Sequence, residues 1–483
     1  TFDSISIMKE SESVYLFAAL VVAAFTSYGD VESIRPLTAK AGLAPFVYIE
    51  SPDVMPNYLA EEKWSTQGRS ITRMQAPLSP GESSKHIVIQ PGFSSQLWAA
   101  EPDITKPIAL AWDERGRLWI AETIDYPNDM QPDGEGNDRI KICEDTDGDG
   151  TADRFTVFAD KLSVPTSLCF GNGGLIVIEG GRTLFLKDTD GDDVADERRV
   201  LFDNWGTRDT HAAASNLRYG PDNWIWGTVG YSGFDGEVGG KRLRFGQGVY
   251  RFKPDGSELE FIKSSNNNTW GLGITEDGLI VGSTANGNAS WYMPIPNRFY
   301  EAVNGWSANR MESVADDQGI YPITDKVRQV DWHDQYTAGA GHALYTARSF
   351  PEEYWNKVSF VTEPTGHLVG FFKLGDVGAD RTAVNMGSFL ASDDEWAAPI
   401  VAEVGPDGAL WVIDWYNYII QHNPTPIGFQ NGKGNAYETE LRDKRHGRIY
   451  RVTYDGGTPS KSRKLSLSDP AGLIAALRSD NQL

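Results

Sequence analysis

Basic residues, cysteines and long apolar runs are all scarce in this sequence of 483 residues. Its 44 lysines and arginines are outnumbered by 67 aspartates and glutamates, which gives a formal net charge of −23. Such a chain has no basic stripe with which to neutralise phosphates, so we expect no nucleic-acid partner. The surplus of carboxylates is typical of a solvated surface, and it is compatible with binding hard cations.

Only two cysteines occur, Cys143 and Cys169, and both lie in apolar, strand-like runs. Together they could form at most one disulfide, and their setting favours buried free thiols. The sequence contains no C-x-x-C-H motif, so we predict no c-type haem attached to this chain. It also contains no cluster of cysteine and histidine that would suggest zinc.

The one strongly apolar run is VYLFAALVVAAF, from Val14 to Phe25. A run of this length is too short to span a bilayer unaided, but it suits the core of a signal peptide. We therefore predict a signal or anchor segment over residues 1–29, export to the periplasm or the outer-membrane surface, and membrane association through the N-terminus. A buried strand or helix is the alternative that the sequence leaves open.

Glycine and aromatic residues are abundant, with Gly 50, Trp 15, Tyr 19 and Phe 21, a composition typical of strands and turns. From His86 onward a turn and a short apolar strand recur, as in DERGRLWIAETID, GNGGLIVIEGG, TEDGLIVGSTANGN and GPDGALWVIDWYN. Further short strands flank each copy, and the copies recur about every 50 to 80 residues. This pattern predicts an all-β fold, a six-bladed β-propeller over residues 87–455. A pair of β-sandwiches, the main rival, would not explain six similar units.

The segments on either side of the repeats differ from them in composition. Residues 30–86 are mixed and punctuated by proline and serine, as in APLSPGESS, and predict an extension or linker. Residues 456–483 predict a linker and then the first helix of a truncated helical domain. Ser468 or Asp469 could cap that helix, and Pro470 would occupy its first turn.

Two acidic loops have nearly the same sequence, CEDTDGDGTADRF and KDTDGDDVADERR. Each has aspartates at positions 1, 3, 5 and 9: Asp145, Asp147, Asp149 and Asp153 in the first, and Asp188, Asp190, Asp192 and Asp196 in the second. The spacing resembles the front of an EF-hand loop, but the glutamate expected at position 12 is missing and strands flank the loops. Clustered carboxylates repel one another, so we predict structural calcium binding at one or both loops. A solvated turn is the alternative.

In a propeller, the loops that enter first strands and those that follow second strands gather at one mouth of the channel, where ligands are expected. The first set contributes Arg208, Asp209, His211, Asn216, Asn267, Asn268, Trp270 and His342. The second contributes Glu122, Asp125, Tyr126, Tyr231, Asn286, Asn288, Glu363, His367, Asp414, Trp415, Tyr416 and Asn417. We predict a polar small-molecule site there. His211 is the leading candidate for a catalytic base, since a neutral imidazole can take a proton from an alcohol or hydrated aldehyde and Asp209 could orient it.

RDTHAAASNLRYGPDNWIWGTVG resembles the segment that carries the catalytic histidine in soluble quinoprotein glucose and sorbosone dehydrogenases. Together with DRIKICEDTDGDGTADRFTVFADKL, GHALYTARSFPEEYWN and GPDGALWVIDWYN, it also resembles the propeller of the planctomycete-type membrane-bound dehydrogenase family of haem-binding proteins. The resemblance implies export, calcium, pyrroloquinoline quinone as hydride acceptor and a c-type cytochrome domain or protein as electron acceptor. His211 would be the base, and cofactor contacts would come from Arg208, Asn216, Asn267, Asn268, Trp270, His342, Arg348, Trp415 and Asn417.

The chain departs from the quinoprotein pattern at one point that concerns the cofactor. That family has an Arg-Asn pair before the fourth first strand, where the arginine helps to neutralise the carboxylates of the cofactor. Here Asn267 and Asn268 occupy the place. A tricarboxylate needs cationic partners, which would then have to come from loop arginines such as Arg208, Arg310 and Arg348.

Three functions remain open from the sequence. The first is an exported dehydrogenase that oxidises a sugar or a sugar-derived alcohol or aldehyde, passing hydride to a quinone and electrons to a c-type cytochrome. The second is a metal-dependent lactonase or hydrolase in which Glu122, Asn268, Asn286 and Asp414 converge on a channel cation. The third is a glycan-binding propeller without enzymatic activity, which is supported by the aromatic loops at Trp270, Trp415 and Tyr416.

Overall fold

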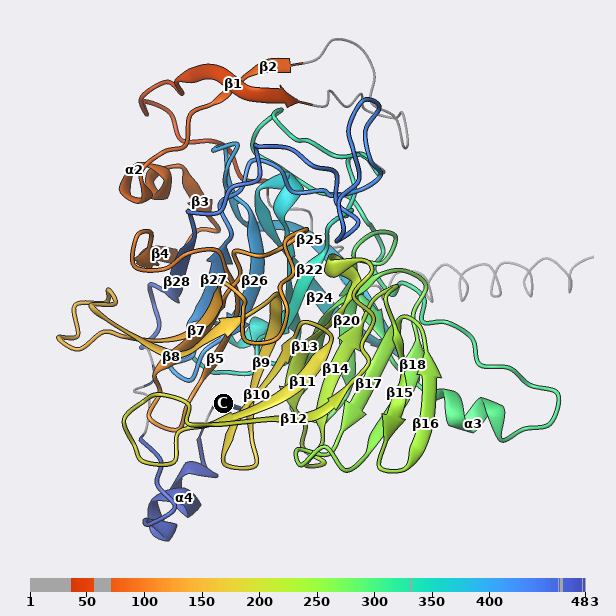
Figure 1. Ribbon diagram of the computed structural model, residues 1–483. Helices are drawn as coiled ribbons and strands as arrows, with labels where there is room; N and C mark the ends of the chain where they lie inside the picture. Colours follow the sequence, from red (N-terminus) through yellow and green to blue (C-terminus); the bar gives the residue numbers. More distant parts are fainter. Residues whose placement is uncertain are drawn as a thin grey trace, which may run out of the picture. The chain divides into compact units, whose positions relative to one another are not determined.

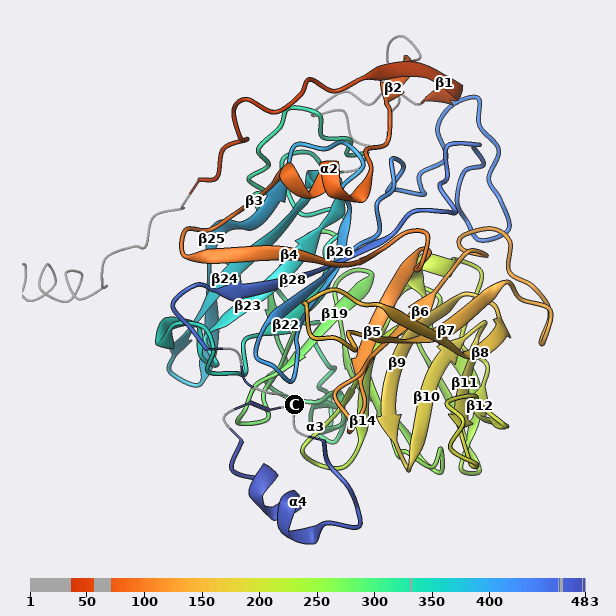
Figure 2. The same cartoon turned by 90° about the vertical axis from the view of Figure 1, so that its left-hand side faces the viewer.

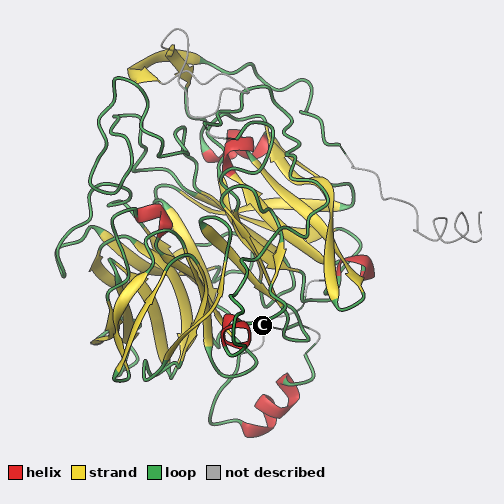
Figure 3. Ribbon diagram, turned by 90° about the vertical axis from the view of Figure 1, so that its right-hand side faces the viewer, coloured by secondary structure: helices red, strands yellow, loops and turns green. Residues whose placement is uncertain are grey.

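The computed structural model describes residues 36–55, 71–330, 332–458, 460, 464–479 and 481–482. Strands dominate these residues, and the helices among them are few and short (Figure 3). The apolar run from Val14 to Phe25 lies outside the described residues, so its predicted role stays a prediction. Within the described part of the chain, no helix has the length and apolar character needed to cross a bilayer.

Six antiparallel sheets form the successive blades of a ring, which confirms the predicted six-bladed β-propeller (Figure 1). Blade 1 contains β5 (Pro107–Trp112), β6 (Leu118–Glu122), β7 (Asp138–Glu144) and β8 (Arg154–Leu162). Blade 2 contains β9 (Pro165–Gly171), β10 (Gly174–Glu179), β11 (Arg182–Lys187) and β12 (Glu197–Asp203). Blade 3 contains β13 (Ala214–Tyr219), β14 (Ile225–Val229), β17 (Gly248–Phe252) and β18 (Leu259–Ser264), with the hairpin β15 (Phe234–Val238) and β16 (Lys241–Phe245) inserted.

The second half of the ring is less regular. Blade 4 contains β19 (Thr269–Ile274), β20 (Ile280–Thr284) and the short β21 (Trp291–Tyr292), and α3 (Asn297–Glu301) follows it. Blade 5 contains β22 (Ala340–Leu344), β23 (Val358–Glu363), β24 (Leu368–Val377) and β25 (Asp380–Ser392). Blade 6 contains β26 (Pro399–Val404), β27 (Leu410–Asp414) and β28 (Arg448–Tyr454). The first strand of each blade faces the channel, so these strands position the loops at its mouth.

Strands from the N-terminal side complete the last two blades. β4 (Phe93–Ala100) pairs with β28 along its whole length, with Phe93 opposite Tyr454 and Ala100 opposite Arg448 (Figure 2). β3 (Ile87–Ile89) pairs with β25 of blade 5. The beginning and the end of the repeat region thus share one sheet, which closes the ring and leaves fewer open sheet edges.

The hydrophobic core lies between neighbouring blades. β6 and β23 are buried along their whole length because both faces of these strands pack against other sheets. Between blades 5 and 6 the ring of Phe93 lies 4.8 Å from that of Phe350 and 5.0 Å from that of Phe389, in edge-to-face arrangements. Edge-to-face contacts add to the stabilisation from burial, and they anchor the strand that closes the ring.

Short elements flank the propeller in the sequence. β1 (Tyr48–Met55) pairs with β2 (Ile71–Gln75), and α2 (Pro80–Lys85) precedes β3. Near the other end, α4 (Pro470–Ala476) begins where the sequence predicts, with Asp469 accepting a hydrogen bond from the backbone N–H of Gly472 at 3.0 Å. That a helical domain follows remains a prediction.

Candidate functional site

A cavity of about 320 Å³ opens at the end of the blades where the first strands begin. The loops that enter β13, β19 and β22 and the loops that follow β6, β14, β20, β23 and β27 form its walls, the two sets that the sequence singles out. The residues that line it include Tyr126, His211, Tyr231, Asn267, Asn268, Trp270, Asn286, Trp332, Thr337, Ala338, Trp415, Gln421, His422 and Asn423.

The lining of this cavity is polar and aromatic but uncharged. Among the described residues that line it, none is a lysine, arginine, aspartate or glutamate. Trp270, Trp332 and Trp415 supply apolar surfaces, and asparagine and glutamine supply amide groups. Flat apolar surfaces combined with a few hydrogen-bonding groups suit a neutral, hydroxyl-rich ligand better than a multiply charged one.

His211 and Asp209 form the pair that the sequence predicts. Nδ1 of His211 lies 2.6 Å from Oδ1 of Asp209, at ion-pair distance, and neither atom makes a well-aligned hydrogen bond to the described residues. Oδ2 of Asp209 accepts a hydrogen bond from Asn435 at 2.8 Å. Burial alone would raise the pKa of Asp209, but the contacts with His211 and Asn435 outweigh it and hold that pKa below its ordinary value. The carboxylate therefore keeps the proton of neutral His211 on Nδ1, which leaves the lone pair of Nε2 available as a base.

Two further contacts hold the backbone around His211. The backbone N–H of Thr210 donates to Gly434 O at 3.2 Å, which ties this short 3-10 helix, Thr210–Ala212, to the long segment between β27 and β28. On the other side, Nδ2 of Asn268 donates to His211 O at 3.4 Å. Oδ1 of Asn268 fills the space beside Gly230, where a Cβ atom would lie only 1.8 Å from it. A glycine at this position therefore permits the contact between Asn268 and His211.

A second histidine, His422, lies beside this pair. Its ring centroid is 5.4 Å from that of His211, its Nε2 lies 2.5 Å from Oη of Tyr126, and its Nδ1 lies 2.6 Å from Nη1 of Arg442. Burial lowers the pKa of His422 well below its ordinary value, and the nearby Arg442, His211 and Lys444 lower it further. The sequence did not single out His422, because it lies in an irregular segment with no motif around it.

Several residues predicted for the site do not line the cavity. Arg208 is exposed, with Nη2 3.4 Å from Tyr231 O, and Asn216 lies on β13. His342 is fully buried on β22, and burial lowers its pKa to about 4. Asn417 is buried and accepts a hydrogen bond from a backbone N–H two residues on.

Arg348 lies at the other end of the blades from the cavity, in the loop between the first and second strands of blade 5. Its guanidinium forms a bidentate ion pair with Glu276, at 2.7 and 2.8 Å. This arginine is therefore paired with a carboxylate away from the predicted ligand site.

The carboxylates required by the metal-dependent hydrolase hypothesis are also engaged elsewhere. Glu122 is buried, contacts Arg139 and Lys141, and accepts a hydrogen bond from the backbone of Thr105 at 2.7 Å. Asp414 accepts backbone hydrogen bonds at 2.7 and 2.9 Å. Neither lines the cavity, so the predicted set does not converge on a channel cation.

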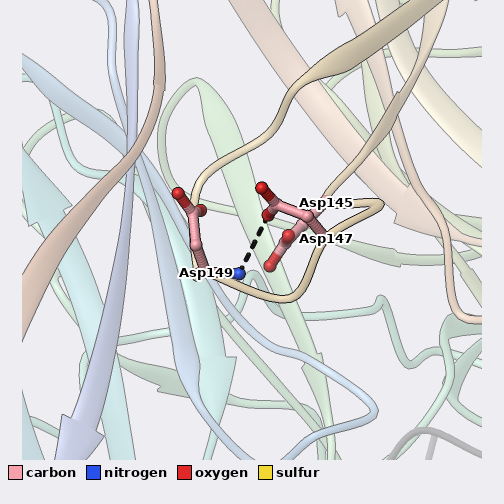
Figure 4. Close-up of side chains that lie close together, drawn as sticks. All are labelled: Asp145, Asp147 and Asp149. Atoms are coloured by element: carbon pink, nitrogen blue, oxygen red, sulfur yellow. Dashed lines mark hydrogen bonds between the residues drawn. The ribbon is translucent and has the colours of Figure 1, made fainter.

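The two acidic loops connect the third and fourth strands of blades 1 and 2, as expected, between β7 and β8 and between β11 and β12. In the first, Asp145, Asp147 and Asp149 can each bring a carboxylate oxygen within 4.8 Å of the others (Figure 4). In the second, the same holds for Asp188, Asp190 and Asp196. None of these six aspartates lines the cavity.

Three aspartates of the loops lie outside these two groups. Asp153 accepts from the backbone and hydroxyl of Thr146 at 3.0 and 2.7 Å, and Asp192 accepts from a backbone N–H at 2.9 Å. Asp193, which replaces the usual turn glycine, forms a bidentate ion pair with Arg117 of blade 1, at 2.8 and 2.9 Å. This aspartate joins the loop of blade 2 to blade 1.

Comparisons with known proteins give one family. A family model described as "Domain of unknown function (DUF7133)" matches residues 79–456. No curated protein sequence matches the chain. The structure is similar to the soluble aldose sugar dehydrogenase of Escherichia coli in its apo form, with 12% identity, 75% of this chain and 99% of that chain covered, and a TM-score of 0.45.

Two further solved structures resemble the chain to a similar degree. The aldose sugar dehydrogenase of Streptomyces coelicolor in its PQQ-bound form is 13% identical, with 76% of this chain and 100% of that chain covered and a TM-score of 0.42. A luciferin-regenerating enzyme is 11% identical, with 78% and 100% covered and a TM-score of 0.44. Likeness at this level does not decide between activities, so the functional argument rests on the site.

Proposed function

The chain belongs to the DUF7133 family, whose description names no activity, and we propose that it is a propeller oxidoreductase acting on a sugar or a sugar-derived alcohol or aldehyde. One observation carries the proposal: the half-buried His211, paired with the buried Asp209, meets an uncharged, aromatic-walled cavity at the mouth of the propeller. A sugar presents hydroxyl groups and apolar ring faces, the chemistry that this lining complements.

His211 acts as the general base in this proposal. Its Nε2 takes the hydroxyl proton of the substrate, while Asp209 stabilises the imidazolium that forms. The hydrogen on the adjacent carbon leaves with its electron pair to an external acceptor of the quinone class. The alcohol thereby becomes a carbonyl compound, and the quinone becomes a hydroquinone by taking up this hydride together with the proton that His211 then releases. Tryptophan surfaces hold the sugar and exclude water from the reacting atoms.

Pyrroloquinoline quinone in particular fits the lining poorly. Its carboxylates require cationic partners, and none of the described lining residues is cationic. Lys106 and Arg442 lie behind the wall, but Lys106 pairs with Asp443 at 2.9 Å and Arg442 donates to His422 and Tyr437. We therefore assign no step to this cofactor.

A substrate assay tests the proposal. The purified chain is incubated with D-glucose and a panel of other aldoses, a dye or soluble quinone as acceptor, and pyrroloquinoline quinone either present or absent. We expect dye reduction without the added cofactor, and its loss in His211→Asn. No turnover under either condition would refute the oxidoreductase. Binding of sugars without turnover would favour the glycan-binding function instead.

Calcium, export and the electron acceptor belong to the same proposal. We propose that the acidic loops bind calcium and that the bound ions stabilise the fold. Two groups of three aspartates support this, since in each group the carboxylate oxygens lie within 4.8 Å of one another. Export to the periplasm or cell surface and membrane association are supported by the apolar run from Val14 to Phe25. A c-type cytochrome as electron acceptor is supported only by the sequence resemblance.

A further inference from the structure

We propose that Tyr126 donates a hydrogen bond to the substrate oxygen that His211 deprotonates, and that Arg442 fixes this direction through His422. The inference rests on the proposed function of the same cavity. It adds Tyr126 as a second polar group at the reacting oxygen. Behind Tyr126 it adds a positioning chain, His422 and Arg442, from the segment between β27 and β28, which the sequence pattern did not link to His211.

The direction of the chain follows from Arg442. A guanidinium has only N–H donors, so at 2.6 Å from Nη1 the Nδ1 atom of His422 must be the acceptor. Nε and Nη2 of Arg442 also donate to Tyr437 O, at 3.1 and 2.7 Å, which fixes the guanidinium. The neutral imidazole then has its single proton on Nε2, and this N–H donates to Oη of Tyr126 at 2.5 Å.

Tyr126 consequently has a hydroxyl hydrogen to give. Its oxygen accepts from His422, and no other hydrogen bond joins that oxygen to the described residues. Tyr126, which follows β6, and His211, which precedes β13, both line the cavity, and the rings of both lie next to that of His422, at 5.0 and 5.4 Å. Burial and the nearby Asp209 raise the pKa of Tyr126, so the phenol stays protonated and remains a donor.

The reverse orientation would leave buried groups in conflict. If His422 carried its proton on Nδ1, this N–H would face an N–H of Arg442. Two donors would then be buried against each other with no acceptor between them. Tyr126 would then have to donate to Nε2 and would have no hydrogen left for the cavity. The observed contacts exclude that arrangement as long as Arg442 is in place.

The chemical consequence concerns the oxygen of the substrate. As His211 removes the hydroxyl proton, negative charge grows on that oxygen, and a fixed donor stabilises it more than it stabilises the neutral alcohol. Tyr126 keeps its proton throughout, so the balance of the reaction is unchanged. The carbonyl oxygen of the product accepts the same hydrogen bond.

The tautomer can be measured without any substrate. In the chain labelled with ¹⁵N-histidine, we expect the His422 resonances of a neutral ring with the proton on Nε2 at pH 7, identified by their loss in His422→Gln. In Arg442→Met this preference should weaken. A proton on Nδ1 of His422 in the unsubstituted chain overturns the proposal, whatever the outcome of the sugar assay.

The role of the hydroxyl is tested with D-glucose, or with whichever aldose of the panel gives the fastest dye reduction. Tyr126→Phe should lower kcat about 100-fold, the typical effect of removing one such donor, and change KM much less. Tyr321→Phe removes a hydroxyl bonded to Asp317 outside the cavity, at 2.6 Å, and should leave kcat unchanged. The effects of Tyr126→Phe and Arg442→Met should not add in the double variant, because both remove the same donor.

The two proposals fail in different ways. An unchanged kcat in Tyr126→Phe overturns the donor role while the oxidoreductase stands. If no aldose is oxidised by the unsubstituted chain, the proposed function falls, and the role of the tyrosine as donor to a reacting oxygen falls with it. The histidine tautomer then still decides whether Arg442 sets the direction of the chain.

Discussion

Nδ1 of His211 lies 2.6 Å from Oδ1 of Asp209 at the entrance to blade 3. Asp209→Asn preserves the shape of the side chain but removes the charge that keeps the imidazole proton on Nδ1. We predict that kcat of aldose oxidation falls at least about 100-fold, within the range for acid–base groups. Asp393→Asn is the matched control, because His86 and Asp393 form a similar pair at 2.8 Å away from the cavity. Equal losses in both variants would indicate a general loss of structure.

Gly230 has a predictable effect on the same histidine. A Cβ atom at this position would lie 1.8 Å from Oδ1 of Asn268 and 2.8 Å from the backbone of Ala212. Gly230→Ala should therefore displace both neighbours of His211 and reduce kcat/KM by at least about tenfold, since small misplacements of catalytic groups are costly. Initial-rate measurements with the best aldose check this.

The control for Gly230 is Gly246→Ala, since a Cβ atom there would meet nothing within 4 Å. Its activity should match that of the unsubstituted chain. If Gly230→Ala is also fully active, the contact between Asn268 and His211 does not hold the site in place.

The ion pair between Asp193 and Arg117 links blades 1 and 2. Asp193 has φ 66°, a conformation that asparagine also tolerates, so Asp193→Asn removes the charge with little backbone effect. We predict that this substitution lowers the free energy of unfolding by about 1 kcal/mol. The effect is smaller than for a fully buried ion pair because the side chain of Asp193 is 27% exposed. Urea unfolding in calcium-free buffer measures it. Asp190→Asn should cause no loss, since repulsion by Asp192 raises the pKa of Asp190.

Calcium should stabilise the fold through the acidic loops. A cation that binds only the folded chain raises its unfolding temperature, and we expect an increase of a few degrees with millimolar calcium over a chelator. The double variant Asp145→Asn with Asp188→Asn should show no increase. Asp160→Asn, an exposed acid outside both groups, should respond like the unsubstituted chain. An identical calcium response in the double variant would assign the effect to another part of the chain.

The fold could be predicted because its repeats can be recognised from short stretches of sequence. Turns with glycine, apolar strands and the copies of the acidic loop each depend on residues close together in the sequence. The closure of blade 6 by β4 was not predicted, because it pairs Phe93 with Tyr454, residues far apart in the chain. The pairing of two strands that are far apart in the chain cannot be recognised from the sequence of either strand alone.

The site was predicted only where its residues flank regular strands. His211, Asn268 and Trp415 line the cavity because they lie next to the ends of strands whose order the repeat reveals. His422 and Asn435 reach the site from the long segment between β27 and β28, whose path depends on tertiary contacts. Their effects on Tyr126 and Asp209 therefore could not be derived from spacing.

Glu363 gives the stability of the cavity wall a defined pH dependence. Its carboxyl accepts hydrogen bonds from the backbone of Thr337 and Ala338, both at 2.9 Å, and these two residues line the cavity. Burial raises its pKa from the ordinary 4.5 to about 7 despite these bonds. Between these values the folded chain holds a proton that the unfolded chain has released. The contribution of Glu363 to the free energy of unfolding should therefore fall as pH rises from 4.5 to 7, by at most about 3 kcal/mol.

The measurement is chemical unfolding of the unsubstituted chain and of Glu363→Gln at several pH values between 4.5 and 7.5. Glutamine cannot take up the proton, so the stability of the unsubstituted chain relative to this variant should decrease as pH rises through the window. Glu353→Gln, at an exposed position, should give a profile parallel to that of the unsubstituted chain. A parallel profile for Glu363→Gln would mean that the buried carboxyl is ionised throughout, because its four accepted hydrogen bonds then outweigh burial.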